Sequence, residues 1–222
     1  MSFHIDLTSI EPLDDLLPHI PVIALQRLFA GQPWATLGPA YLLVANFVRL
    51  VDLAISEYEA GRAAFSTYYN PDSQHAGGIA ISAAVRASGH FEHCLTDAHR
   101  AIQHCRRSRR HRSIPPGLRA RLPQGPEVLS GKGDGTLNDF RDLIQHLEER
   151  LLGLTKKGPA IGEHEMALLM LNGDKQVDGT ATTLVLNRLE AGPLRLPLAT
   201  LAGWLRELHD RARQVVEYPV EG

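Results

Sequence analysis

An arginine, an aspartate and a histidine lie close together in one short stretch of the chain, as Arg141, Asp142 and His146. A guanidinium stays charged and presents paired donors that match phosphate oxygens. An imidazole takes up and releases protons near neutral pH. Together they could cleave RNA through its own 2′-hydroxyl, because histidine can move the protons while arginine stabilises the charged phosphorus centre. This chemistry needs neither a metal ion nor a cofactor, so none is predicted.

These three side chains occupy the polar face of an expected amphipathic helix. Two helical positions five residues apart are separated by about 140° around the axis and about 7.5 Å along it, so Arg141 and His146 flank one surface. Asp142 lies one turn before His146 and is expected to hold its ring. One such face is half a site, which a second copy across a two-fold axis would complete. Behind it, apolar residues recur at steps of three and four: Leu137, Phe140, Ile144, Leu147, Leu151 and Leu154.

The spacing of the arginine and the histidine carries no weight alone, because this composition produces such pairs by chance. Three occur, at Arg86–His93, Arg106–His111 and Arg141–His146. The first arginine is followed by alanine, and the second pair lies in a basic run. Only the third pair has an acidic residue after the arginine and an apolar stripe behind it, so it is the candidate.

The stretch from Phe140 to Leu151, which reads FRDLIQHLEERL, resembles the signature helix of HEPN domains. Their motif is an arginine, usually followed by Asn, Asp or His, with a histidine after four to six intervening residues. Arg141, Asp142 and His146 match those positions, so the resemblance implies that they are catalytic. It also implies a bundle of four or five helices and a metal-independent endoribonuclease that acts as a homodimer through this helix. Many members work in toxin–antitoxin or anti-phage defence systems, which implies RNA as substrate and an antitoxin or defence-complex protein as partner.

One position departs from a subgroup of that family. Toxins paired with nucleotidyltransferase antitoxins carry a tyrosine two residues after the histidine, whereas Glu148 stands there in this chain. Silencing through modification of that tyrosine is therefore unavailable. Some members are scaffolds without activity, and the acidic pair Glu148 and Glu149 disfavours a polyanion near His146. The alternative prediction is a non-catalytic helical interaction subunit of a defence complex.

An arginine cluster between residues 106 and 121 contains seven arginines and no acidic residue. The whole chain has a formal net charge of −2, so only this local cluster favours nucleic acid. Contacts with an RNA backbone would be independent of sequence and sensitive to salt. The alternative is a solvated or partner-facing loop, since basic residues also stabilise helix C-termini. The candidate RNA-binding residues are Arg106, Arg107, Arg109, Arg110 and Arg112.

The second long helix is rich in histidine and acidic residues: His90, Glu92, His93, Cys94, Asp97, His99 and His104. The spacing of His90, His93 and Asp97 would permit a transition metal. No cysteine pair and no His-Glu-x-x-His motif supports one, so a polar helix face is the preferred interpretation and no metal site is predicted. Because this helix should pack against the next, His93 or Asp97 is expected to line the same cleft as His146.

The elements that position these residues predict a mainly α fold. Long helices are expected over about 39–64, 79–107, 137–153 and 198–216, in a bundle domain spanning 39–222. Residues 1–38 are expected to form an arm with short helices. Short apolar runs between about 164 and 197 predict two or three antiparallel strands before the last helix. The turn signal Asn172-Gly173-Asp174 is expected between strands, and Thr136 with Asp139 is expected to cap the third helix.

Composition places the chain among globular proteins. It has 222 residues, of which 44% are hydrophobic and 22% charged, enough for one domain with a sizeable core. Cys94 and Cys105 fall on one helix about 16 Å apart, which favours reduced thiols. The most apolar stretch, residues 39–58, contains Asn46, Arg49 and Asp52, so no membrane span is predicted. No secretory signal is recognised, and a cytoplasmic location is expected.

Overall fold

The computed structural model describes residues 2–6, 9–29, 39–68, 77–122, 128–146 and 169–218. It is mainly helical with a small sheet before the last helix, which confirms the predicted fold class at that level. The helices are α1 (Ile20–Phe29), α2 (Pro39–Tyr68), α3 (Gly77–Arg110), α4 (Pro116–Arg121), the short 3-10 helix η3 (Ser130–Lys132), α5 (Gly133–Gln145) and α7 (Leu198–Val216). The strands are β1 (Ser2–Asp6), β2 (Met170–Asp178), β3 (Ala181–Ala191) and β4 (Leu194–Pro197).

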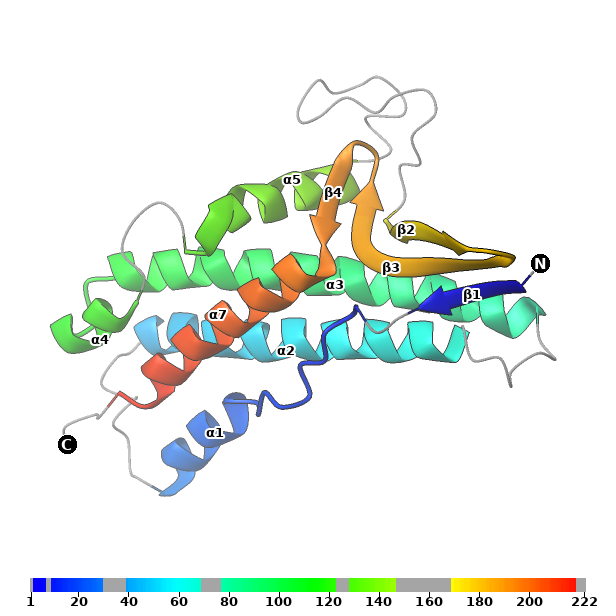
Figure 1. Cartoon of the computed structure of the whole chain (residues 1–222). Helices are drawn as coiled ribbons and strands as arrows, with labels where there is room; N and C mark the ends of the chain where they lie inside the picture. Colours follow the sequence, from blue (N-terminus) through cyan, green and yellow to red (C-terminus); the bar gives the residue numbers. More distant parts are fainter. Residues whose placement is uncertain are drawn as a thin grey trace.

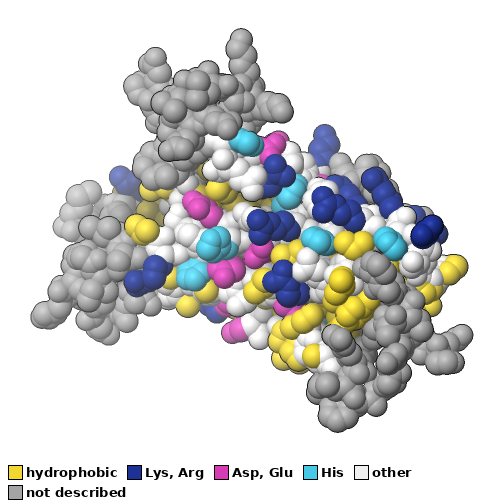
Figure 2. Space-filling view, turned by 180° about the vertical axis from the view of Figure 1, so that it is seen from behind, with side chains coloured by type: hydrophobic (Ala, Val, Ile, Leu, Met, Phe, Trp, Pro, Cys, Tyr) yellow, Lys and Arg dark blue, Asp and Glu magenta, His cyan; other side chains and the backbone are white. Residues whose placement is uncertain are grey.

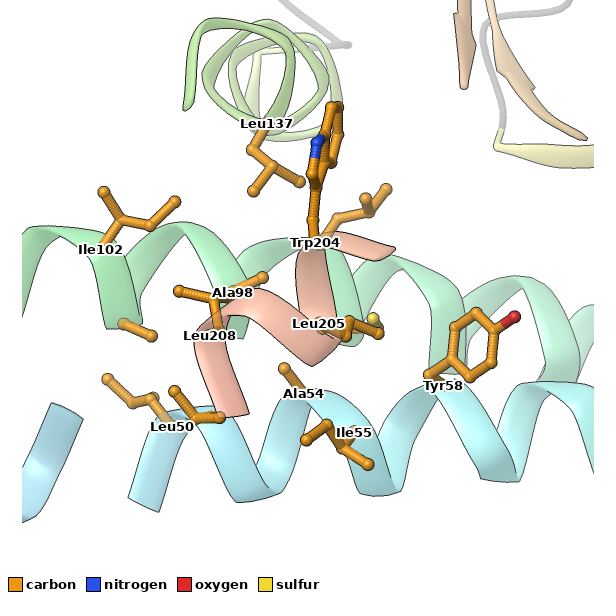
Figure 3. Close-up of a cluster of buried hydrophobic side chains, with 14 of the residues drawn as sticks. Leu50, Ala54, Ile55, Tyr58, Ala98, Ile102, Leu137, Trp204, Leu205 and Leu208 are labelled. Atoms are coloured by element: carbon orange, nitrogen blue, oxygen red, sulfur yellow. The ribbon is translucent and has the colours of Figure 1, made fainter. Parts of the chain in front are cut away.

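The two longest helices, α2 and α3, lie antiparallel side by side and form the base of the bundle (Figure 1). Helix α7 crosses them on one face, and α5 packs along α3. Apolar side chains of these helices meet in the space between them. Each fully buried Leu or Phe contributes about 1.5–3 kcal/mol to the stability of the fold. Figure 3 shows this core, in which all of the labelled side chains are buried: Leu50, Ala54, Ile55, Tyr58, Ala98, Ile102, Leu137, Trp204, Leu205 and Leu208.

The sheet has the strand order β1-β3-β2, and β4 also pairs with β3. The antiparallel pairs β2–β3 and β3–β4 agree with the predicted strands. Strand β1 runs parallel to β3, with Ser2 opposite Ala181 and Asp6 opposite Val185. This parallel strand was not predicted, because its partner lies far along the chain and leaves no local pattern.

The predicted turn at Asn172-Gly173-Asp174 is wrong, because all three residues lie inside β2 at a register irregularity. A Cβ on Gly173 would lie 2.0 Å from the carbonyl oxygen of Val185. The glycine therefore permits close approach of two backbones. The chain turns instead at Gly179 and Gly192, whose φ angles of 56° and 53° suit glycine.

Helix α5 begins at Gly133, so the predicted cap at Thr136 is wrong. Its N-cap is Lys132, which has a left-handed φ of 63°. Thr136 lies inside the helix, and Asp139 is not at its third position. The start is determined by tertiary contacts, since Asp134 in the first turn accepts the backbone N–H groups of Val128 and Leu129.

The other end of α5 also differs from the prediction. The helix ends at Gln145, and His146 is its C-cap with φ −113° and ψ 20°, so the histidine does not lie mid-helix. Residues 147–168 lie outside the described residues, including Leu147, Glu148, Leu151 and Leu154 of the predicted helix. Within the described ranges, the helices are all too short or too polar to cross a membrane.

Candidate functional site

The polar face of α5 holds the predicted arginine and aspartate at the surface. The helix packs through the buried side chains of Leu137, Phe140 and Leu143. This packing leaves Arg141 and Asp142 partly exposed, at 30% and 32% of their side-chain surface. Both groups are therefore held by the fold and accessible to a ligand.

Arg141 contacts a histidine of the neighbouring helix. Its Nη1 lies 3.2 Å from Nε2 of His99, a residue of α3 that is only 4% exposed. A guanidinium can only donate hydrogen bonds, so Nε2 accepts and the remaining ring proton sits on Nδ1. Burial and the charge of Arg141 lower the pKa of His99. His99 is therefore a neutral support that fixes the guanidinium without adding charge.

Asp142 is held by two side chains of its own helix. Its Oδ1 lies 2.7 Å from Nη2 of Arg141, and its Oδ2 accepts a hydrogen bond from Asn138 Nδ2 at 3.2 Å. The predicted contact between Asp142 and the His146 ring stays a prediction. The backbone N–H of His146 donates to the carbonyl oxygen of Asp142 at 3.2 Å, which places the histidine one turn beyond the aspartate.

The arrangement leaves Arg141 able to bind an anion. Its Nε is a buried donor without a hydrogen-bond partner among the described residues. The carboxylate of Asp142 balances its charge in the free protein. A phosphate group could take the place of that carboxylate, since two of its oxygens can accept a pair of hydrogen bonds from the guanidinium.

The five candidate RNA-binding arginines of the cluster divide into two groups. Arg106 forms an ion pair with the buried Asp134 beneath α5, and Arg109 donates to the carbonyl oxygen of Leu122. These two arginines hold the fold together. Three others, Arg107, Arg110 and Arg112, are exposed and remain open to a polyanion.

The histidine-rich part of α3 mainly faces α2. His90 Nδ1 lies 2.7 Å from Glu57 Oε2, and His93 Nδ1 lies 3.9 Å from the same oxygen. Asp97 pairs with Arg100 at 3.7 Å. Across the described ranges, no group of three His, Cys, Asp or Glu side chains is arranged to hold a metal ion.

His99 is the site residue that was missed, since His93 or Asp97 was expected to provide the contact from α3. One signal could have identified it. His99 and Arg106 lie seven residues apart, so they share a face of α3, and both contact polar side chains of α5. Their partners, Arg141 and Asp134, are likewise seven residues apart.

Comparison of this chain with known proteins assigns it to no family. No family model, curated protein or solved structure matches this chain. The site is therefore interpreted from its own residues and contacts.

Proposed function

We propose that this chain is a metal-independent endoribonuclease of the HEPN type that acts as a dimer in a toxin–antitoxin or anti-phage defence system. The observation that carries the proposal is the placement of Arg141. Its guanidinium is held at the surface between His99 and Asp142, and His146 follows five residues later as the C-cap of the same helix. A fixed cation and a histidine are the groups that RNA transphosphorylation requires.

In the proposed reaction the 2′-hydroxyl of a nucleotide attacks the adjacent phosphorus. The bond between phosphorus and the 5′-oxygen breaks, and the products are a 2′,3′-cyclic phosphate and a 5′-hydroxyl. His146 accepts the 2′-hydroxyl proton, and the same histidine of a second copy donates a proton to the leaving oxygen. Arg141 binds the non-bridging oxygens, where negative charge grows in the transition state.

The neighbours of Arg141 act as positioning residues in this scheme. His99 is neutral, so it orients the guanidinium without repelling or competing with the phosphate. Asp142 keeps the arginine paired until substrate arrives. Exchange of one anion for another avoids leaving a charge unpaired, which is costly at a partly buried site.

Cleavage of a fluorescent single-stranded RNA tests the proposal. We expect Arg141→Ala and His146→Ala to lower the cleavage rate by at least about a hundredfold, the contribution typical of a general acid or base. Neither residue belongs to the apolar stripe, so both variants should remain folded, and thermal denaturation checks this. Arg141→Ala should have the lower midpoint of the two, because it removes the contacts with His99 and Asp142. The matched control is His93→Ala, which removes an exposed histidine of α3 and should cleave normally.

Two results would reject the ribonuclease. One is cleavage that persists in both variants, and the other is cleavage that EDTA abolishes. Sedimentation velocity of the same samples tests the dimer.

A second candidate, the non-catalytic interaction subunit, is favoured by the pairing of Arg141 with Asp142 in the free chain. It predicts a dimer that does not cleave RNA in any of the variants.

A further inference from the structure

A chain of hydrogen bonds links α2 to α3 on the side of the molecule away from α7. Arg49 Nε donates to Asn46 Oδ1 at 2.9 Å. This contact orients the amide so that Asn46 Nδ2 faces His104 Nε2 at 3.1 Å. Because the amide nitrogen donates, Nε2 of His104 accepts and its proton sits on Nδ1. The group that remains without a partner in this series of hydrogen bonds, Nδ1–H of His104, is therefore a donor.

His104 is surrounded by positive charge. Its Nδ1 is a buried atom and has no hydrogen-bond partner among the described residues. Burial and the guanidinium groups of Arg107 and Arg49 lower its pKa. Arg49 and Arg107 are both exposed. The two exposed guanidinium groups beside this buried donor carry positive charge that a bound anion would balance.

Helix geometry connects this group with the candidate site. Measured around α3 from His99, Arg107 lies at about 80° and His104 at about 140°. His99 faces α5 and His104 faces α2, so Arg107 occupies the exposed surface between them. Figure 2, drawn from behind Figure 1, shows basic side chains and histidines on that face of the molecule, with acidic side chains interspersed among them.

We propose that Arg49, His104 and Arg107 form a binding site for the phosphate backbone of single-stranded RNA, which then crosses α3 toward Arg141. The choice of RNA as the ligand of this site rests on the proposed function. Between Gly89 and Arg110, the described helix α3 exposes no large apolar side chain. Protein interfaces need an apolar or aromatic centre, whereas phosphate contacts need arginines and neutral donors.

A measurement of RNA binding without cleavage tests this site independently of the catalytic residues. The probe is a fluorescein-labelled oligouridylate, and binding is followed by fluorescence anisotropy in the His146→Ala background, where the probe stays intact. We expect the double substitution Arg49→Gln/Arg107→Gln to weaken binding at least about tenfold at low salt. The dependence of log K on log salt should become shallower by about 1.4, because each lost contact with a single strand removes about 0.7.

The matched control removes two exposed arginines from another part of the surface. Arg195 on β4 and Arg213 on α7 are 72% and 53% exposed, so Arg195→Gln/Arg213→Gln makes the same change in net charge. This variant should bind RNA with the affinity of its parent. Equal affinities and equal salt slopes for the two double variants would overturn the site.

The ring of His104 provides a second readout that a purely structural role would not move. Proton NMR should show that saturating oligouridylate raises the pKa of His104, since a bound phosphate stabilises the imidazolium. In Arg49→Gln/Arg107→Gln the pKa should already be higher without RNA, because two repelling charges are gone, and it should respond less to RNA. A pKa that RNA leaves unchanged would contradict the proposal.

The two proposals fail in distinguishable ways. If the wild type cleaves RNA and both double variants bind it equally, the ribonuclease stands and this site falls. If binding depends on Arg49 and Arg107 but no cleavage occurs, the ribonuclease falls and the site stands. If the chain does not bind RNA even at low salt, the site is overturned, and an acidic protein surface becomes the ligand to test.

Discussion

Neighbouring arginines of α3 have opposite roles. Arg106 and Asp134 form an ion pair, and the same carboxylate accepts hydrogen bonds from two backbone N–H groups that precede α5. Arg107, one residue later, is exposed. In the sequence these two arginines belong to one basic cluster, and no local property separates them. The structure separates them because α5 covers one side of α3 only.

Substitution of Asp134 tests this difference at the scale of one residue. We expect Asp134→Ala to lower the free energy of unfolding by about 3–5 kcal/mol, because it leaves Arg106 partly buried without its ion-pair partner. Urea denaturation measures the change. Asp139→Ala, which removes an exposed aspartate from the same helix, should stay within about 0.5 kcal/mol of the wild type. Equal losses in both variants would mean that the ion pair does not support α5.

At the scale of elements, the contact between α5 and α7 determines where the candidate site lies. A Cβ on Gly133 would come within 2.7 Å of the Trp204 ring and 2.8 Å of Leu129 Cβ. Trp204 also donates from Nε1 to the carbonyl oxygen of Ser130 at 3.1 Å. The tryptophan therefore holds the first turn of α5, and the orientation of this turn carries through the helix to Arg141.

Two glycines of α5 give a matched pair of tests. We expect Gly133→Ala to cost about 1–3 kcal/mol, since the methyl group forces a rigid indole to move. Gly135→Ala has open space around the new Cβ and should be neutral or stabilise the fold by up to about 1 kcal/mol, because alanine favours a helix. Thermal denaturation compares them. A Gly133→Ala variant as stable as Gly135→Ala would show that α5 can shift freely on α7.

At the scale of the whole molecule, the N-terminal segment is tied to the bundle by polar contacts. Asp52 of α2 accepts the backbone N–H groups of His19 and Ile20 at 2.9 and 2.7 Å. The rings of His19 and His209 stack with centroids 4.2 Å apart, which joins this segment to α7. Arg206 of α7 adds ion pairs with two acidic residues of the same segment, Glu11 and Asp15. The segment is therefore part of the packed structure.

Three histidines make the stability of the fold depend on pH. Burial is the first cause that lowers the pKa of His19, His99 and His104 below the ordinary value of 6.5. These histidines therefore bind protons more tightly in the unfolded chain than in the folded chain. The stabilisation is complete above about pH 6.5 and is lost as pH falls through the lower folded-state values.

Urea midpoints between pH 7.5 and 5.5 measure this dependence. We expect the midpoint to fall across this range, and the fall to become smaller in His19→Phe, which keeps a ring against His209 without a titrating group. Glu92 and Asp97 have pKa values raised by burial, so their effect has the opposite sign and works against the fall. A midpoint that stays constant from pH 7.5 to 5.5 would contradict the prediction.

The amino-acid sequence by itself determined the helices and much of the core. Apolar periodicity is a local property, so α2, α3 and α7 correspond to three of the predicted helices, and the bounds of α7 agree with the prediction. The strands before the last helix follow from the same kind of pattern. The choice of Arg141, Asp142 and His146 also came from local residues, and their catalytic role stays a proposal.

Only the tertiary structure decided which residues meet across elements. Three interactions join segments far apart in the chain: the contact between His99 and Arg141, the parallel pairing of β1 with β3, and the ion pair of Arg106 with Asp134. The tertiary structure also decided where α5 begins. Contacts of Asp134 and Trp204, rather than a capping side chain, determine its start at Gly133. Such contacts depend on how helices pack, and helical periodicity shows which face is buried without identifying the residue opposite.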